Sequence, residues 1–142
     1  MASFFTRLLP DNTDLWREFL DLVRQFRPTI MDYSQYHIIL TTSGDEVWLM
    51  FDRPGGKIIG TGTLHFQRKF IHNRAVVGRI EDVIIHKDYR GSGYGKKLIQ
   101  HLIQQAKQTC YKVVDCTTDL ASFYQHCGMT KSGNIQMEVR FA

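Results

Sequence analysis

Three glycines within five residues mark segment 90–96 as a place where the backbone can hold an anion. Glycine permits conformations in which several backbone N–H groups converge on one point. The first four N–H groups of a helix lack partners within the helix, and the helix dipole favours negative charge at that end. The segment joins a predicted strand to a predicted helix and consists of Arg90, Gly91, Ser92, Gly93, Tyr94, Gly95 and Lys96. It therefore predicts a phosphate-binding loop.

Two common phosphate loops do not fit this segment. A Walker A loop requires a glycine at the position of Arg90 and Ser or Thr at that of Lys97. The dinucleotide-binding fingerprint requires a glycine where Lys96 stands. What remains is Arg-x-x-Gly-x-Gly at a strand-to-helix junction. From the residues alone, a glycine-rich turn that binds nothing stays open as the alternative.

An acidic pair, Glu81-Asp82, interrupts the apolar run of the predicted strand 75–86 that leads to the loop. Carboxylates suit proton transfer in acid–base catalysis. Taken alone, however, such a pair is more typical of a solvated strand end than of a catalytic site.

Alternating strands and helices are predicted to position these groups. The clearest helix is 94–109, in which Leu98, Ile99, Leu102 and Ile103 recur on one face. Arg53-Pro54-Gly55-Gly56 predicts the turn of a hairpin. The remaining predicted strands are 4–8, 46–52, 57–66, 113–117 and 135–141, and the remaining helices begin near residues 14, 29 and 120. The predicted fold class is α/β (α+β), a mixed central β-sheet flanked by helices.

Length and composition indicate one soluble domain, residues 1–142. The 142 residues are 43% hydrophobic and 23% charged, and no apolar run approaches the ~20 residues of a membrane span. Cys110, Cys116 and Cys127 form no CxxC pair, which argues against disulfides and a zinc site, and the histidines have no metal-binding spacing. We expect an intracellular protein, cytoplasmic by default, although an organellar address is not excluded.

The net charge of +4 is compatible with an anionic partner or with chance surface charge, and nucleic acid is not favoured. No block of five like charges occurs, and no basic run carries interleaved aromatic residues.

Two motifs together resemble the Gcn5-related N-acetyltransferase (GNAT) superfamily. The Arg-x-x-Gly-x-Gly loop is similar to the pyrophosphate loop of that family. The segment Phe123 to Met129 resembles its Phe/Leu-Tyr-x-x-x-Gly-Phe element, and the order of the predicted elements matches its fold. This resemblance implies an acetyl-CoA-dependent acyltransferase.

Other segments resemble one family within GNAT, the glucosamine 6-phosphate N-acetyltransferases, which feed UDP-N-acetylglucosamine synthesis. The similarity is close over residues 65–141 and rests on Lys69–His72, Ile80–Val83, Cys110–Lys112, Asp115-Cys116, Phe123-Tyr124 and Met137–Arg140. The alternatives that stay open are a GNAT enzyme for another amine, such as a protein or a polyamine, and a non-catalytic acyl-CoA-binding regulator.

For acetyl-CoA, the resemblance implies a site on the loop and on the strand before it. The pyrophosphate would lie on the backbone amides of Gly91–Lys96, with Arg90 alongside. The pantetheine arm would pair with the strand residues Val83, Ile84 and Ile85. No metal is implied.

For the phosphosugar, the resemblance implies a pocket completed by a second copy of the chain. Arg140 would bind the phosphate from the neighbouring subunit, so a homodimer is implied. The other implied substrate residues are Lys69, Phe70, Ile71, His72, Glu81, Asp82, Tyr111, Lys112 and Asp115.

For the reaction, the resemblance implies direct attack of the amine on the thioester, through a tetrahedral intermediate and without an acyl-enzyme. Asp115 and Glu81 are the candidates to accept the amine proton, and Tyr124 would donate to the departing thiolate. A backbone N–H near Val83 would polarise the thioester oxygen.

Two departures from the family pattern affect the implied site. The segment between Lys112 and Asp115 is one residue shorter than usual, which reverses their relative facing along a strand. The segment Phe26-Arg27-Pro28 does not resemble the Thr-rich loop of the family. If this segment reaches the sugar, we expect Arg27 to meet the phosphate.

Overall fold

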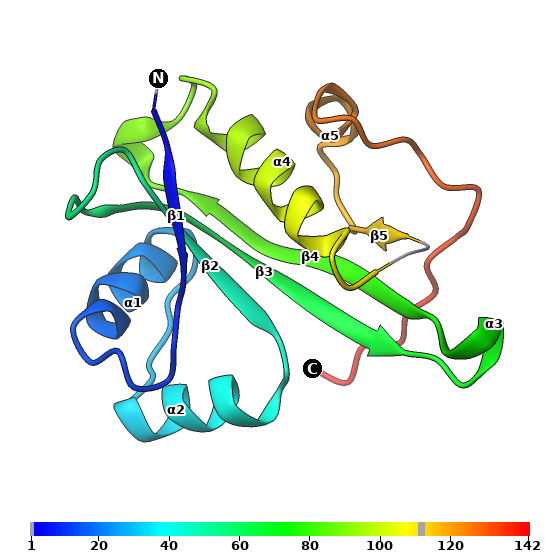
Figure 1. Cartoon of the computed structure of the whole chain (residues 1–142), viewed down its shortest axis with the longest axis horizontal. Coiled ribbons are helices and arrows are strands. Elements are labelled where there is room, and N and C mark those ends of the chain that lie inside the picture. The colour runs from blue at the N-terminus through cyan, green and yellow to red at the C-terminus, as the bar shows by residue number, and fades with distance from the viewer. Residues whose placement is uncertain (1, 111–112) are drawn as a thin grey trace.

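The chain folds around a five-stranded sheet with the strand order β1-β2-β3-β4-β5 (Figure 1). The fold is described from a computed structural model that covers residues 2–110 and 113–142. The strands are β1 (Phe4–Arg7), β2 (Glu46–Phe51), β3 (Ile58–Arg68), β4 (Val76–Ile85) and β5 (Val114–Asp115). The first four strands pair antiparallel, whereas β5 runs parallel to β4. The predicted mixed sheet is therefore confirmed.

Helices cover both faces of this sheet. The helices are α1 (Leu15–Phe26), α2 (Tyr33–Thr42), α3 (Ile71–Arg74), α4 (Tyr94–Ala106) and α5 (Ala121–His126), with a 3-10 turn, η1 (Lys87–Tyr89). Of these, α3 lies at the end of the β3–β4 pair and covers neither face (Figure 1). Leu98, Ile99 and Leu102 of α4 are fully buried against the sheet, as their spacing predicts. The opposite face packs against α1 and α2 through Leu22 and Tyr36. Each face has its own hydrophobic core, so the sheet separates two compartments, one on the α4 side and one on the α1–α2 side.

Helix α2 begins later in the chain than the sequence predicts. The helix begins at Tyr33 rather than near Thr29, because Asp32 caps it. The Asp32 side chain accepts from the Gln35 N–H at 2.8 Å, and the Gln35 side chain accepts from the Asp32 N–H at 3.0 Å. Residues 27–32 are thereby left as an extended connection along the edge of one compartment.

The predicted last strand, 135–141, is wrong for the single chain. This segment pairs with no strand among the described residues. Its alternating apolar side chains are exposed: 85% at Ile135, 86% at Met137, 73% at Val139 and 94% at Phe141. The pattern is that of a strand, but the segment joins none of the sheet edges that the described residues form.

Smaller differences affect two other segments. The predicted strand 113–117 is reduced to Val114–Asp115, and the connection between β3 and β4 contains the short element α3. Within the described residues, no helix is both long and apolar enough to cross a membrane.

Candidate active site on the two sides of strand β4

A β-bulge interrupts β4 at the acidic pair. Thr63 pairs with Glu81 and Thr61 pairs with Ile84, so two residues of β4 stand opposite one residue of β3. Asp82 adopts a left-handed conformation with φ of 51°. Bulges of this kind bend a strand and redirect its groups. The acidic pair therefore sits where the strand changes direction, rather than at a solvated strand end.

The bulge turns the backbone of Val83 and Ile85 away from β3. The His86 N–H donates to the Ile59 carbonyl of β3 at 2.8 Å. Because backbone groups alternate along a strand, Ile84 also bonds toward β3, while Val83 and Ile85 face the other side. Of the three residues predicted to pair with pantetheine, these two have the right orientation.

The side that Val83 and Ile85 face is open. β5 pairs with β4 only at Gly78 and Arg79, and no other strand of the described chain lies along that edge. β5 ends at Asp115, the partner of Arg79, so the backbone of β4 beyond Arg79 has no paired strand on this side.

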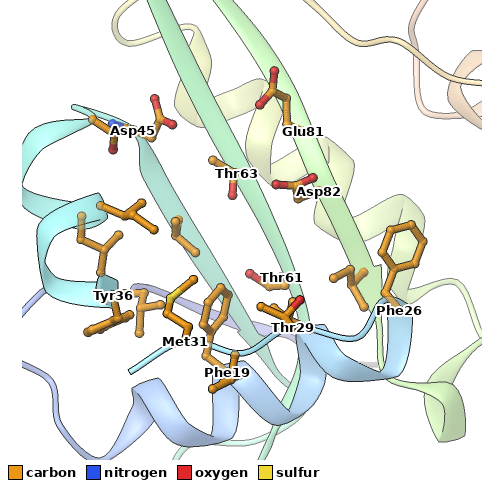
Figure 2. A pocket seen from close by; sticks show the side chains of 18 of the residues that line it. Phe19, Phe26, Thr29, Met31, Tyr36, Asp45, Thr61, Thr63, Glu81 and Asp82 are labelled. Carbon is orange, nitrogen blue, oxygen red and sulfur yellow. Dashed lines mark hydrogen bonds between the residues drawn. The ribbon is translucent and has the colours of Figure 1, made fainter. Parts of the chain in front are cut away.

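On the α1–α2 side of the sheet, Glu81 and Asp82 line a cavity of about 400 Å³ (Figure 2). Its floor is apolar and includes Phe19, Met31 and Tyr36. Polar groups reach it from three elements: Thr61 and Thr63 of β3, Arg27 and Thr29 of the α1–α2 connection, and Asp45, which pairs with His65 Nδ1 at 2.7 Å. An apolar hollow with convergent polar groups is typical of a small-molecule site.

On the other side of β4, Asp115 and Tyr124 line a second hollow of about 700 Å³. Burial, reinforced by the neighbouring Cys116 and Cys127 thiols, raises the pKa of Tyr124 to about 12. The phenol is therefore protonated at neutral pH and available as a donor. Burial also raises the pKa of both cysteines, which keeps them as thiols rather than nucleophilic thiolates.

Arg79 contacts Asp115 of this hollow, and the sequence did not single it out. Its Nε lies 3.1 Å from Asp115 Oδ1, and its Nη1 donates to Thr117 Oγ1 at 3.2 Å. Thr117 Oγ1 in turn donates to Gln136 Oε1 at 2.9 Å. The candidate base is thus held by an arginine that also contacts the C-terminal segment. The only sequence signal was the position of Arg79 two residues before Glu81.

The glycine-rich loop lies directly after β4, at the start of α4. Gly91 and Gly93 have φ of 77° and 87°, a region open to glycine at little cost. Gly93 is the residue that precedes the first turn of α4, which carries no acidic residue. A Cβ on Gly95 would lie 3.2 Å from Phe123 Cζ, so this glycine allows α4 and α5 to approach. The free helix N–H groups and the left-handed glycines fit a pyrophosphate.

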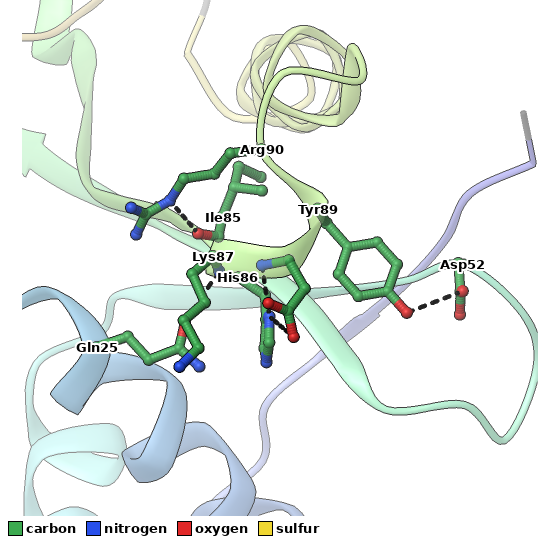
Figure 3. A network of polar contacts seen from close by, with 8 residues as sticks. Gln25, Asp52, Ile85, His86, Lys87, Tyr89 and Arg90 are labelled. Atoms are coloured by element: carbon green, nitrogen blue, oxygen red, sulfur yellow. Dashed lines mark hydrogen bonds and ion pairs between the residues drawn. The ribbon is translucent and has the colours of Figure 1, made fainter.

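Arg90 ties this loop to β4 (Figure 3). Its Nε donates to the Ile85 carbonyl at 3.0 Å. A second bond, from the Lys87 N–H to Gln25 Oε1 at 3.1 Å, joins the same junction to α1. The junction between β4 and α4 is therefore held to β4 by Arg90 and to α1 by Lys87, and the Ile85 carbonyl is already occupied.

Several residues implied by the resemblance lie outside both cavities of this chain. Lys69, Phe70, Ile71 and His72 stand at the far end of the β3–β4 pair, where Phe70 is fully exposed. Arg140 lies in the exposed C-terminal segment and bonds only to Glu138, at 3.1 Å, among the described residues. Tyr111 and Lys112 fall outside the described residues. The substrate roles of these residues stay predictions.

The mixed sheet and the glycine-rich loop at the start of α4 agree with the fold that the resemblance to the GNAT superfamily implies. Residues 11–129 match the family described as "Acetyltransferase (GNAT) family". This match covers well over half of the chain, so the protein belongs to the GNAT family.

Individual relatives indicate one group of enzymes within the GNAT family. The chain is 39% identical over 139 residues to the "Probable glucosamine 6-phosphate N-acetyltransferase 2" of Oryza sativa subsp. japonica, covering 91% of this chain and 83% of that protein. It is 34% identical to the "Glucosamine 6-phosphate N-acetyltransferase" of Arabidopsis thaliana, with 99% of both chains covered. The crystal structure of glucosamine-6-phosphate N-acetyltransferase from Arabidopsis thaliana superimposes with a TM-score of 0.78 at 28% identity, covering both chains fully.

Proposed function

We propose that this single-domain protein transfers the acetyl group of acetyl-CoA to the amine of D-glucosamine 6-phosphate. The observation that carries the proposal is the bulge at Glu81-Asp82. It directs two carboxylates into one cavity while it opens the backbone of Val83 on the opposite side. The acceptor amine then approaches β4 from the α1–α2 side, and the thioester approaches the open edge of β4. The names of the plant relatives support the choice of acceptor.

Acetyl-CoA supplies the acetyl group as a thioester. The amides of residues 91–96 at the start of α4 are suited to bind its pyrophosphate, and Arg90 is suited to lie alongside. The backbone of Val83 and the N–H of Ile85 are suited to pair with its pantetheine arm, because they face the open edge and the Ile85 carbonyl already accepts from Arg90. The Val83 N–H, placed directly after the bulge, is the candidate donor to the thioester oxygen.

Proton transfer falls to Glu81, Asp115 and Tyr124. A carboxylate accepts the proton of the attacking amine, directly or through water. Glu81 lines the acceptor cavity, and Asp115 lines the hollow that also contains the Tyr124 side chain. The Tyr124 hydroxyl, protonated because burial raises its pKa, donates to the departing thiolate.

We infer that the working unit is a homodimer. The C-terminal segment carries four exposed apolar side chains with strand periodicity, and Arg140 lies among them with 78% of its side chain exposed. Burying such a segment against the sheet of a second copy removes apolar surface from water and pairs its backbone. This arrangement supports the expectation that Arg140 reaches the phosphate in the neighbouring subunit. An intracellular setting is supported by the three free cysteines.

The proposal is tested by the release of free CoA thiol. Purified protein is mixed with acetyl-CoA and either glucosamine 6-phosphate, glucosamine or spermidine. We expect rapid thiol release with the phosphosugar and much slower release with the other two amines. No release with glucosamine 6-phosphate contradicts the proposed acceptor, and no release with any amine contradicts the transferase activity.

A further inference from the structure

The cavity lined by Glu81 and Asp82 is the acceptor cavity. Some of its charged side chains have a polar partner within the chain, and others have none among the described residues. Asp45 is paired with His65. Glu81, Asp82 and Arg27 make no side-chain hydrogen bond or ion pair with any other described residue. The cavity therefore presents two free carboxylates from β4 and one free guanidinium from the α1–α2 connection.

The backbone around Arg27 is fixed although its guanidinium is free. The Arg27 N–H donates to the Val23 carbonyl at 3.1 Å, and the Thr29 hydroxyl donates to the Arg27 carbonyl at 3.3 Å. Arg24 Nε donates to the Thr29 carbonyl at 2.9 Å, which holds the connection against α1. The connection thus sets the direction from which the Arg27 side chain leaves the backbone.

The Arg27 side chain itself rests on an aromatic ring. Its Cζ lies 5.3 Å from the centre of the Phe26 ring, and Phe26 also lines the cavity. Stacking on a ring leaves the N–H donors at the edge of the guanidinium available. A planar fork of this kind binds two phosphate oxygens at once.

We infer that Arg27 binds the phosphate of the acceptor and thereby selects a phosphorylated amino sugar over other amines. The inference rests on the proposed function. Free carboxylates complement an ammonium group, and a free guanidinium complements a phosphate dianion. The cavity thus matches a ligand that carries both charges. A polyamine has no group for Arg27 and is repelled by it. Because Arg27 belongs to the same chain as Glu81, this contact needs no second subunit.

The test compares Arg27→Gln with Arg17→Gln. Arg17 is a matched control, because its Cζ also stacks on an aromatic ring of α1, 5.7 Å from the centre of Trp16, but it lies outside the acceptor cavity. We expect Arg27→Gln to lower kcat/KM for glucosamine 6-phosphate by about 10- to 100-fold. The KM for acetyl-CoA and the slow rate with glucosamine stay unchanged. Arg17→Gln leaves all of these values as in the wild type.

A binding measurement separates this inference from the proposed function. Glucose 6-phosphate has the phosphate but no amine, so its binding, measured by calorimetry, requires no acetyl transfer. We expect Arg27→Gln to weaken this binding and Arg27→Lys, which keeps the charge but not the fork, to weaken it less. An equal loss with glucosamine and glucosamine 6-phosphate, or unchanged binding of glucose 6-phosphate, overturns the role of Arg27. A wild-type protein inactive on glucosamine 6-phosphate overturns the proposed function instead.

Discussion

At the scale of single residues, the Tyr124 phenol is the group whose protonation state is best defined. The raised pKa of about 12 keeps it protonated throughout the range in which enzymes are assayed. We predict that Tyr124→Phe lowers kcat by about 100- to 10,000-fold, the usual contribution of a general acid, with little change in the KM for acetyl-CoA. Steady-state kinetics from pH 6 to 9 measure both values, and the wild-type profile shows no loss of activity from ionisation of Tyr124.

Tyr33→Phe is the control for this substitution. The Tyr33 hydroxyl donates to the Pro10 carbonyl at 3.0 Å, in the other compartment, so its removal leaves kcat unchanged. An unchanged kcat for Tyr124→Phe removes this residue from the chemistry.

At the scale of elements, the loop before α4 requires a left-handed backbone conformation, which is costly for residues other than glycine. Gly91 has φ of 77°, and Gly44 in a remote turn has φ of 72°; a Cβ added at either glycine meets no atom within 4 Å. Alanine at either position costs about 1 kcal/mol of stability through left-handed strain. We predict that only Gly91→Ala weakens acetyl-CoA binding, because only the strain at Gly91 changes the shape of the proposed pyrophosphate loop.

Calorimetric titration with acetyl-CoA, alongside urea unfolding, measures the two effects of these glycine substitutions. If Gly91→Ala and Gly44→Ala lose equal stability and still bind acetyl-CoA with equal affinity, the pyrophosphate does not bind at the loop that contains Gly91.

Helix α2 is fastened to the start of the chain by a buried phenol. The Tyr36 hydroxyl donates to the Leu9 carbonyl at 2.7 Å, and burial raises the Tyr36 pKa to about 12. Folding thus favours the protonated phenol, so this contribution to stability is complete below pH 10 and is lost as the pH rises toward 12. We predict that Tyr36→Phe lowers the free energy of unfolding by about 1 kcal/mol at pH 7.

The same substitution reduces the loss of stability between pH 9 and pH 11, because one titrating group is gone. Urea unfolding at pH 7, 9 and 11 measures this difference. If Tyr36→Phe loses as much stability between pH 9 and pH 11 as the wild type does, Tyr36 is not the group whose ionisation destabilises the fold.

At the scale of the whole molecule, the C-terminal segment predicts shared active sites. If Arg140 acts in the neighbouring subunit, the homodimers of Tyr124→Phe and Arg140→Ala are both impaired. A mixed dimer then contains one site with both defects and one intact site. We predict that an equal mixture, unfolded and refolded together, recovers about a quarter of wild-type activity, because half of the dimers are mixed.

The two variants refolded separately and then combined are the control for this experiment. No recovery after joint refolding means that Arg140 acts within its own chain or not at all. A monomer in sedimentation contradicts the homodimer itself.

The order of strands and helices was largely readable from the sequence, because it depends on local patterns. Apolar spacing in 94–109 predicts the buried face of α4, and the Pro-Gly turn predicts the β2–β3 hairpin. The start of α2 was misplaced by four residues, since its capping box outweighs the weak apolar period before it. The strand 135–141 was predicted from a correct period, but a strand also needs a partner, and periodicity does not say whether this chain provides one.

The sequence by itself determined the loop, its position before a helix, and the resemblance that names the acceptor, because these depend on residue types and their spacing. Only the tertiary structure decided how the site is divided. The bulge at Asp82, which a linear pattern does not reveal, sends the acidic pair into one cavity, while the backbone of Val83 faces the open edge of β4. Arg27 and Arg79 joined the site for the same reason: contacts between distant segments form only when the sheet brings them together.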